Sequence, residues 1–216
     1  MVQNVTEGPG GGEILAEPAA ALERICAAAE AEFRGHGFHA TTMDAVARAA
    51  GCSKKTIYKL FDSKEALFFR LLDRFKDRAQ RIEVDPGLPP QAALEGFLWR
   101  IGRLILDEEA VSTLRMVLGE YRLSPSLLQA AERHFGGGIL ALDAYLARLE
   151  AEGLYRFGAP AEAARMLMGM ALGAYHHERL IGLLPGVPEA ALRTRIQKAV
   201  TIFLAGTRLP PRPAAC

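Results

Sequence analysis

The feature that most constrains this chain is a pair of short amphipathic segments separated by Gly51. In the first segment, residues 43–50, apolar side chains recur at the spacing of a helix that has one buried face. Thr41 precedes Asp44 by three residues, which predicts a capping box at the start of this helix, and Gly51 predicts its end. We therefore expect a helix of about two turns, followed by a tight turn.

The second segment is expected to form a helix from about Lys54 to Leu60. Ser53 is a favoured N-cap residue, and Cys52 and Ile57 occupy the positions of a hydrophobic staple around it. An earlier helix is expected over Ala19–Arg34, where apolar residues form one stripe before two glycines. The sequence therefore predicts a head of three helices.

The second short helix would have one apolar face and one basic face. At about 100° per residue, Ile57, Leu60 and Phe61 lie on the side that we expect to pack. The opposite side carries basic and hydrogen-bonding groups, namely Lys55, Thr56, Tyr58 and Lys59. A helix with such a face, placed after a short helix and a tight turn, suits a helix-turn-helix that reads the major groove of DNA. The alternative is that these lysines only form a solvated face.

The charge distribution favours the DNA-binding interpretation. The whole chain has a net charge of only +1, which by itself indicates no nucleic-acid partner. The charge is uneven, however, because residues 48–64 hold five basic residues and one acidic residue, whereas residues 1–33 hold six Glu and one Arg. A local basic patch therefore coincides with the predicted helix-turn-helix.

A longer pattern surrounds the two short helices and consists of Gly37–Phe38, Thr41–Ala47, Ala50–Phe61 and Ser63–Leu67. This pattern resembles the DNA-binding domain of the tetracycline-repressor (TetR) family. The resemblance implies that Thr42, Tyr58 and Lys64 contact phosphates, and that lysines of the second helix line the groove. The predicted DNA-contacting set is Thr42, Ser53, Lys54, Lys55, Thr56, Tyr58, Lys59 and Lys64.

The remaining chain is expected to be helical. We predict a flexible tail over residues 1–18, the DNA-binding domain over 19–67, a regulatory and dimerisation domain over 68–209, and a second flexible tail over 210–216. Expected helices of the body are Gln91–Leu106, Glu108–Arg122, Ser126–Glu152 with a break at Gly136–Gly138, Ala161–Leu183 and Pro188–Thr207. The predicted fold class is all-α: a three-helix helix-turn-helix head plus a larger helical bundle.

In the resembled family, the body binds a small ligand among its middle helices and dimerises through its last two long helices. Aromatic, charged and Met side chains of the body are therefore candidate ligand-binding residues. They are Trp99, Arg115, Met116, Glu120, Met168, Tyr175 and His176. Such side chains at helical spacing more often fill a core, so a purely structural role stays open for each.

The sequence gives little support to several other classes of protein. The three cysteines are unevenly spaced and have no paired Cys/His set, so neither a disulfide framework nor a metal site is expected. The sequence contains no nucleophile elbow, phosphate loop or carboxylate pair, so no motif points to an enzyme or to a cofactor. The N-terminus has no signal-peptide pattern and no apolar run is long enough for a membrane span, so we expect a cytoplasmic protein.

The predicted function is that of a homodimeric, sequence-specific transcriptional regulator. We expect a repressor that an apolar or amphipathic small molecule releases from a palindromic operator. A constitutive repressor without an effector is the main alternative. An all-helical enzyme and a helical interaction module that binds no DNA also remain open, and salt-sensitive binding to a palindromic duplex would separate a regulator from both.

Overall fold

The structure is a computed structural model that describes residues 13–120 and 140–210. Apart from one isolated bridge between Tyr155 and Arg208, the described residues form helices and no β-structure, which confirms the all-α fold class. The chain divides into two compact units, Met1–Leu72 and Asp73–Cys216. None of the described helices is both long enough and apolar enough to cross a membrane.

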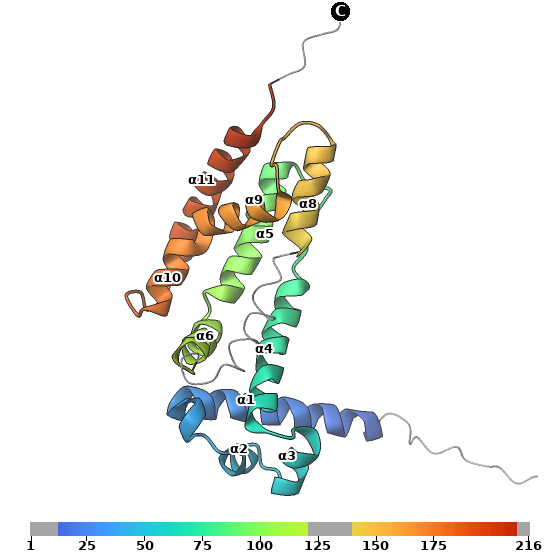
Figure 1. Cartoon of the computed structure of the whole chain (residues 1–216), viewed down its shortest axis with the longest axis vertical. Helices are drawn as coiled ribbons and strands as arrows, with labels where there is room; N and C mark the ends of the chain where they lie inside the picture. The colour runs from blue at the N-terminus through green and yellow to red at the C-terminus, as the bar shows by residue number, and fades with distance from the viewer. Residues whose placement is uncertain (1–12, 121–139, 211–216) are drawn as a thin grey trace, which may run out of the picture. The chain divides into compact units, whose positions relative to one another are not determined.

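The first unit contains α1 (Glu13–Ala40), α2 (Met43–Ala49), α3 (Lys54–Leu60) and the first part of α4 (Lys64–Gln80) (Figure 1). Helix α1 begins before the expected Ala19, so the prediction of a flexible tail is wrong for residues 13–18. The reason is local, because Glu, Leu and Ala residues that favour helix precede Pro18. The helix is kinked at Gly37, whose φ of 79° favours glycine.

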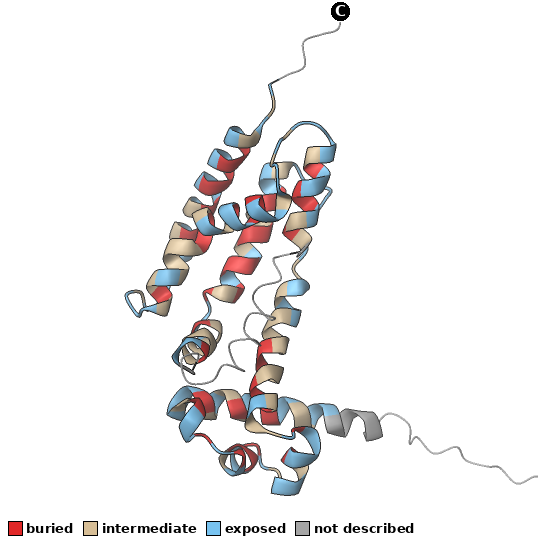
Figure 2. Ribbon diagram, viewed as in Figure 1, coloured by how far each residue is buried: buried red, intermediate tan, exposed pale blue. Residues whose placement is uncertain are grey.

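Apolar side chains from all four helices form the core of the first unit (Figure 2). Fully buried members include Ile25, Phe33, Val46, Ile57 and Phe68. The Phe33 and Phe68 rings meet edge to face with centroids 5.9 Å apart, and Phe38 packs on both. Complete burial of one such side chain stabilises a fold by about 1.5–3 kcal/mol. These buried side chains therefore hold α2 and α3 against α1 and the first part of α4.

Within the described residues, the second unit contains the last part of α4 and the helices α5, α6, α8, α9, α10 and α11. Their bounds are α5 Pro90–Ile105, α6 Glu108–Glu120, α8 Leu140–Ala151, α9 Pro160–Met168, α10 Ala174–Leu180 and α11 Glu189–Thr207. The segment expected as one helix over Ala161–Leu183 is divided by a π-helix, η1, at Gly169–Gly173. The predicted start at Ser126 and the predicted break at Gly136–Gly138 lie outside the described residues.

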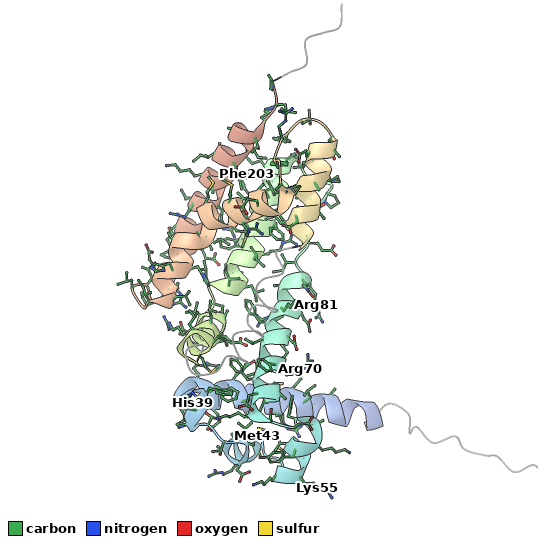
Figure 3. All side chains as sticks on the ribbon, viewed as in Figure 1. His39, Met43, Lys55, Arg70, Arg81 and Phe203 are labelled. Carbon is green, nitrogen blue, oxygen red and sulfur yellow. The ribbon has the colours of Figure 1, made fainter. Side chains whose placement is uncertain are left out.

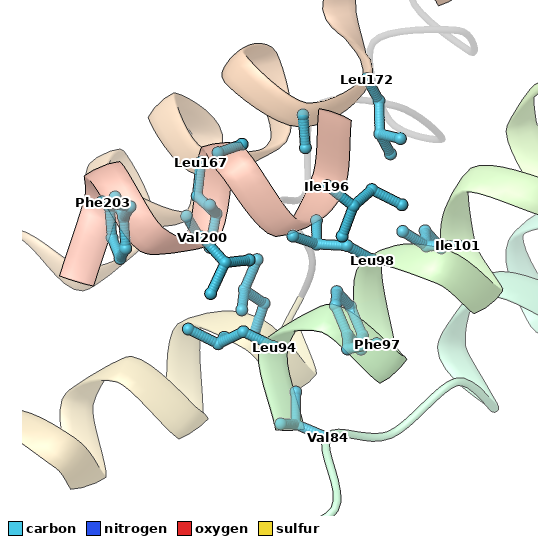
Figure 4. Packing of buried hydrophobic residues seen from close by; sticks show 14 of the residues in the cluster. Val84, Leu94, Phe97, Leu98, Ile101, Leu167, Leu172, Ile196, Val200 and Phe203 are labelled. Atoms are coloured by element: carbon cyan, nitrogen blue, oxygen red, sulfur yellow. The ribbon is translucent and has the colours of Figure 1, made fainter. Parts of the chain in front are cut away.

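Helix α5 is central to the core of the second unit. Its buried side chains include Leu94, Phe97, Leu98 and Ile101, which pack with Ile196 and Val200 of α11 (Figure 4). At Gly102, an added Cβ would lie only 3.0 Å from Cδ2 of Leu172 in the π-helix. Glycine at this position therefore allows α5 and the π-helix to approach closely.

A buried arginine, Arg179 on α10, joins several segments of the second unit. Its Nε donates to the carbonyl of Leu106 at 3.3 Å, and its Nη1 donates to the carbonyl of Leu184 at 3.2 Å. Its Nη2 pairs with Oε2 of Glu108 at 2.7 Å. The Arg179–Glu108 hydrogen bond holds the pKa of that carboxyl below its usual range, with help from Ser112. Arg179 therefore fastens the end of α10 to the α5–α6 junction.

Candidate nucleic-acid interface

Thr42 caps α2, and Thr41 does not. The Thr42 hydroxyl oxygen accepts the main-chain N–H of Ala45 at 3.1 Å. The Thr41 side chain is buried, and its hydroxyl lies 3.1 Å from the carbonyl of Glu32 and 2.8 Å from that of Gly37. The predicted capping box from Thr41 is therefore wrong, because that side chain turns back onto α1. Thr42 remains exposed, and its hydroxyl hydrogen is available to an external acceptor.

The turn between α2 and α3 is a Schellman motif. The N–H of Cys52 donates to the carbonyl of Ala47 at 2.9 Å, and the N–H of Gly51 donates to the carbonyl of Arg48 at 3.2 Å. Gly51 has a φ of 65°, a conformation that other residues adopt only with strain. This turn sets the direction in which the chain leaves α2 before α3 begins.

Helix α3 has the bounds that the sequence predicts, and the Ser53 cap is confirmed. The Ser53 hydroxyl accepts the N–H of Thr56 at 3.0 Å, and the two hydroxyls lie 2.8 Å apart. Ile57 and Phe61 are buried as expected. The prediction that Leu60 packs beside them is wrong, because Leu60 is 41% exposed. Phe61 follows the helix in an extended conformation and is buried.

The outward side of α3 presents Lys55, Tyr58 and Lys59, all of which are exposed. Lys55 lies at the outer edge of the first unit (Figure 3). Within residues 13–120 and 140–210, neither Lys55 nor Lys59 has a hydrogen-bond or ion-pair partner. The arrangement therefore offers two unpaired ammonium groups and one phenol on a short, firmly capped helix.

Lys54 is held differently from its neighbours. Its Nζ lies 2.9 Å from Oδ2 of Asp44 on α2 and 5.9 Å from the centroid of the Tyr58 ring. The hydrogen bond and the negative charge of Asp44 raise the pKa of Lys54. Both groups are well exposed, so a phosphate could replace Asp44 as the partner of this ammonium at small cost.

Lys64, the remaining predicted DNA contact, lies at the start of α4. Ser63 caps this helix by accepting the N–H of Ala66 at 3.1 Å. The Lys64 ammonium is already bonded within the first unit, to main-chain carbonyls near the end of α1. The other seven predicted contacts lie on α3 or at the two N-caps.

The structure places the two aromatic ligand candidates in different hollows of the second unit. Trp99 lines a groove of about 230 Å³ between α5 and α11, and the Arg193 guanidinium stacks over its ring at 3.7 Å. Tyr175 lines an open hollow between α10 and α11, with the Arg195 guanidinium 5.4 Å from its ring centroid. The two rings therefore do not share one of these hollows.

The other ligand candidates have mainly structural surroundings. Arg115 donates from Nε to the carbonyl of Leu180 at 2.9 Å, at the end of α10. Met168 packs against the core, and Met116 is partly buried. Burial lowers the pKa of His176, because removal from water disfavours the charged imidazolium. The side chain of Glu120 lies outside the described residues.

Comparison with known proteins assigns both units. Residues 25–71 match the family model of the bacterial regulatory proteins of the tetR family. Residues 92–206 match the C-terminal domain of the AefR-like transcriptional repressors, which is more than half of the chain. The chain belongs to the TetR family. This confirms the predicted helix-turn-helix transcriptional regulator, and the relatives are regulators rather than enzymes.

Sequence relatives support this assignment over part of their length. The uncharacterized HTH-type transcriptional regulator Rv1556 of Mycobacterium tuberculosis is 34% identical over 113 residues, which is 51% of this chain and 53% of the relative. YhgD of Bacillus subtilis, also an uncharacterized HTH-type regulator, is 42% identical over 69 residues, which is 30% of this chain and 36% of that protein. The matches thus span about half or less of the length of these curated relatives.

Solved structures match nearly the whole chain. A TetR-family transcriptional regulator from Mesorhizobium loti is 26% identical with a TM-score of 0.77, covering 89% of this chain and 98% of that one. The flavonoid-responsive regulator FrrA is 28% identical with a TM-score of 0.73, covering 90% and 100%. SmeT, the repressor of the Stenotrophomonas maltophilia multidrug efflux pump SmeDEF, is 25% identical with a TM-score of 0.60, covering 87% and 90%.

Proposed function

We propose that this TetR-family member binds operator DNA by laying α3 in the major groove. The observation that carries the proposal is the division of α3 into a buried side, centred on Ile57, and an outward side of unpaired lysines and a phenol. Ammonium groups on such a surface are attracted by the phosphate charge of DNA, whatever its sequence. The chain would act in the cytoplasm, where bacterial DNA is found, and no catalytic step is needed.

Roles within the interface follow from reach and chemistry. Lys55 can donate to the acceptors of guanine, and Thr56 can donate to a base or contact the methyl group of thymine. Thr42 and Tyr58 carry hydroxyls suited to phosphate oxygens, which position the protein without reading sequence. Lys54 would exchange Asp44 for a phosphate when DNA binds.

We propose further that the regulator is a homodimer. One α3 offers too few contacts for high specific affinity, whereas two related by a dyad would read half-sites about 34 Å apart. In the second unit, Met166 on α9 is 60% exposed and Ile202 on α11 is 52% exposed. Exposed apolar side chains on these two helices are suited to an interface with a second copy.

The chain is proposed to repress transcription until a small molecule binds its second unit. Its C-terminal match is to a repressor domain, and FrrA is flavonoid-responsive while SmeT represses an efflux pump. The effector is expected to be apolar or amphipathic, because the unit is rich in apolar side chains. By linkage, an effector that lowers DNA affinity must itself bind less tightly to the DNA-bound protein, by the same factor.

Selection from a pool of random duplexes tests the DNA-binding proposal. We expect the full chain to enrich a palindrome whose half-sites lie about one helical turn apart. Enrichment of no sequence, with no salt-dependent binding to any duplex, would contradict it.

A thermal-shift screen of organic molecules, with each hit titrated against the selected duplex, tests the effector proposal. We expect at least one hit that raises the melting temperature and weakens DNA binding. Hits that stabilise the protein and leave DNA affinity unchanged would favour a constitutive repressor.

A further inference from the structure

The Lys64 ammonium makes hydrogen bonds within the first unit, whereas the ammonium groups of Lys55 and Lys59 make none with the described residues. The Nζ of Lys64 donates to three main-chain carbonyls: Phe38 at 2.6 Å, Thr41 at 3.0 Å and His39 at 3.3 Å. It also lies 4.4 Å from the centroid of the Phe38 ring. An ammonium has three N–H donors, so these carbonyls use its full capacity.

The chain around Gly37 explains why a cation is needed here. Beyond the kink at Gly37, Phe38 and His39 lie in the last turn of α1, where carbonyls have no intrahelical donors, and Thr41 follows the end of the helix. These carbonyls carry partial negative charge, which a nearby ammonium stabilises. The Phe38 ring adds a cation–π contact, and Phe38 itself packs against Phe33 and Phe68 in the core.

We propose that Lys64 is a positioning residue, which holds the α1–α2 segment against the start of α4, and not a phosphate contact. The proposal rests on the proposed DNA-binding function. Thr41, whose carbonyl Lys64 binds, directly precedes Thr42, the N-cap of α2. Lys64 therefore sets where α2 begins, and through the α2–α3 turn it sets the placement of the reading helix.

The first test uses the unmodified full chain without DNA. Nitrogen-15 NMR of lysine ammonium groups measures how fast their hydrogens exchange with water. We expect the Lys64 ammonium hydrogens to exchange at least about tenfold more slowly than those of Lys55 and Lys59, because hydrogen-bonded groups are protected. Equal exchange at all three sites would overturn the proposal.

The second test compares Lys64→Met with Lys59→Met, a matched change at an exposed ammonium. We expect Lys64→Met to lower the melting temperature by about 5 °C or more and to weaken DNA binding equally at all salt concentrations. Lys59→Met should leave the melting temperature unchanged and make the dependence of log affinity on log salt shallower by about 0.9, because an exposed ammonium that lines the groove neutralises about one phosphate charge.

The opposite pattern for Lys64→Met, an unchanged melting temperature with a salt slope shallower by about 0.9, would show a phosphate contact and overturn the proposal. If Lys64→Met does not fold, the exchange measurement on the unmodified chain still decides the matter. If the unmodified chain binds no duplex, the DNA-binding function fails, while the exchange and melting data still report on Lys64.

Discussion

Replacing Arg179 by Met should destabilise the second unit more than any exposed ion-pair change. The Arg179 side chain is only 4% exposed, and its guanidinium bonds carbonyls from two separate segments besides Glu108. Methionine fills much of the same volume and removes every donor. The substitution therefore tests the hydrogen bonds rather than the packing.

The loss of stability depends on whether each group that loses its hydrogen bond to Arg179 can bind water instead. Leu106 is buried, so its carbonyl loses a charged donor and gains little water, at a cost of about 1–3 kcal/mol. The carbonyl of Leu184 lies in a partly exposed loop and can regain water. Glu108 is 57% exposed, so loss of its partner is screened and contributes less than about 1 kcal/mol. We expect a total loss of about 2–4 kcal/mol in the free energy of unfolding.

Calorimetry and urea denaturation would measure this loss. At about 2–4 °C per kcal/mol for a chain of this size, the melting temperature should fall by roughly 5–15 °C. Arg165→Met is the matched control, since Arg165 pairs with Glu162 on α9 but is 64% exposed, and it should cost about 0.5 kcal/mol or less. If Arg179→Met costs no more than Arg165→Met, the structural role derived for Arg179 is refuted.

Three further predictions concern the cap of α3, two exposed apolar side chains of the second unit and a buried histidine. Ser53→Ala should destabilise the first unit by about 1 kcal/mol in urea denaturation, because it removes the cap of α3; an unchanged midpoint would contradict the capping role. If the chain forms the proposed dimer, Met166→Glu with Ile202→Glu should convert it to a monomer in analytical ultracentrifugation, and persistence of a dimer would contradict an interface at these side chains. Because burial lowers the pKa of His176, the unfolded chain binds its proton more readily than the folded one. The free energy of unfolding should therefore decrease as the pH falls below about 6.5, and His176→Gln should lessen that decrease; an equal decrease in both proteins would contradict it.

Local signals in the sequence were sufficient to predict α3. Ser53 supplies a cap and Ile57 supplies the buried position, and both act within one or two turns of the chain. Thr41 and Leu60 differ from the prediction because packing against other parts of the first unit decides their surroundings. Thr41 is drawn to carbonyls of α1, and of the two neighbours expected to pack, Phe61 is buried while Leu60 stays exposed.

The roles of Lys64 and Arg179 could not be predicted from periodicity. A basic residue in a sequence is expected at the surface, and only the fold shows which carbonyls surround it. The carbonyl partners of Lys64 lie 23 to 26 residues away along the chain, and Leu106 lies 73 residues from Arg179. For the same reason, the ligand candidates could be listed by residue type, whereas the grouping of Trp99 with Arg193 required the structure.

Fluorescence anisotropy with the selected duplex tests the central claim most directly. The affinities of Lys55→Ala and Tyr58→Ala would be compared with those of the unmodified chain and of Lys76→Ala, a lysine change on α4 outside the helix-turn-helix. The account predicts that each of the first two variants loses roughly tenfold or more in affinity, about 1.4 kcal/mol, with an unchanged melting temperature, while Lys76→Ala binds normally. Full affinity in both α3 variants would contradict the claim that this helix reads the operator.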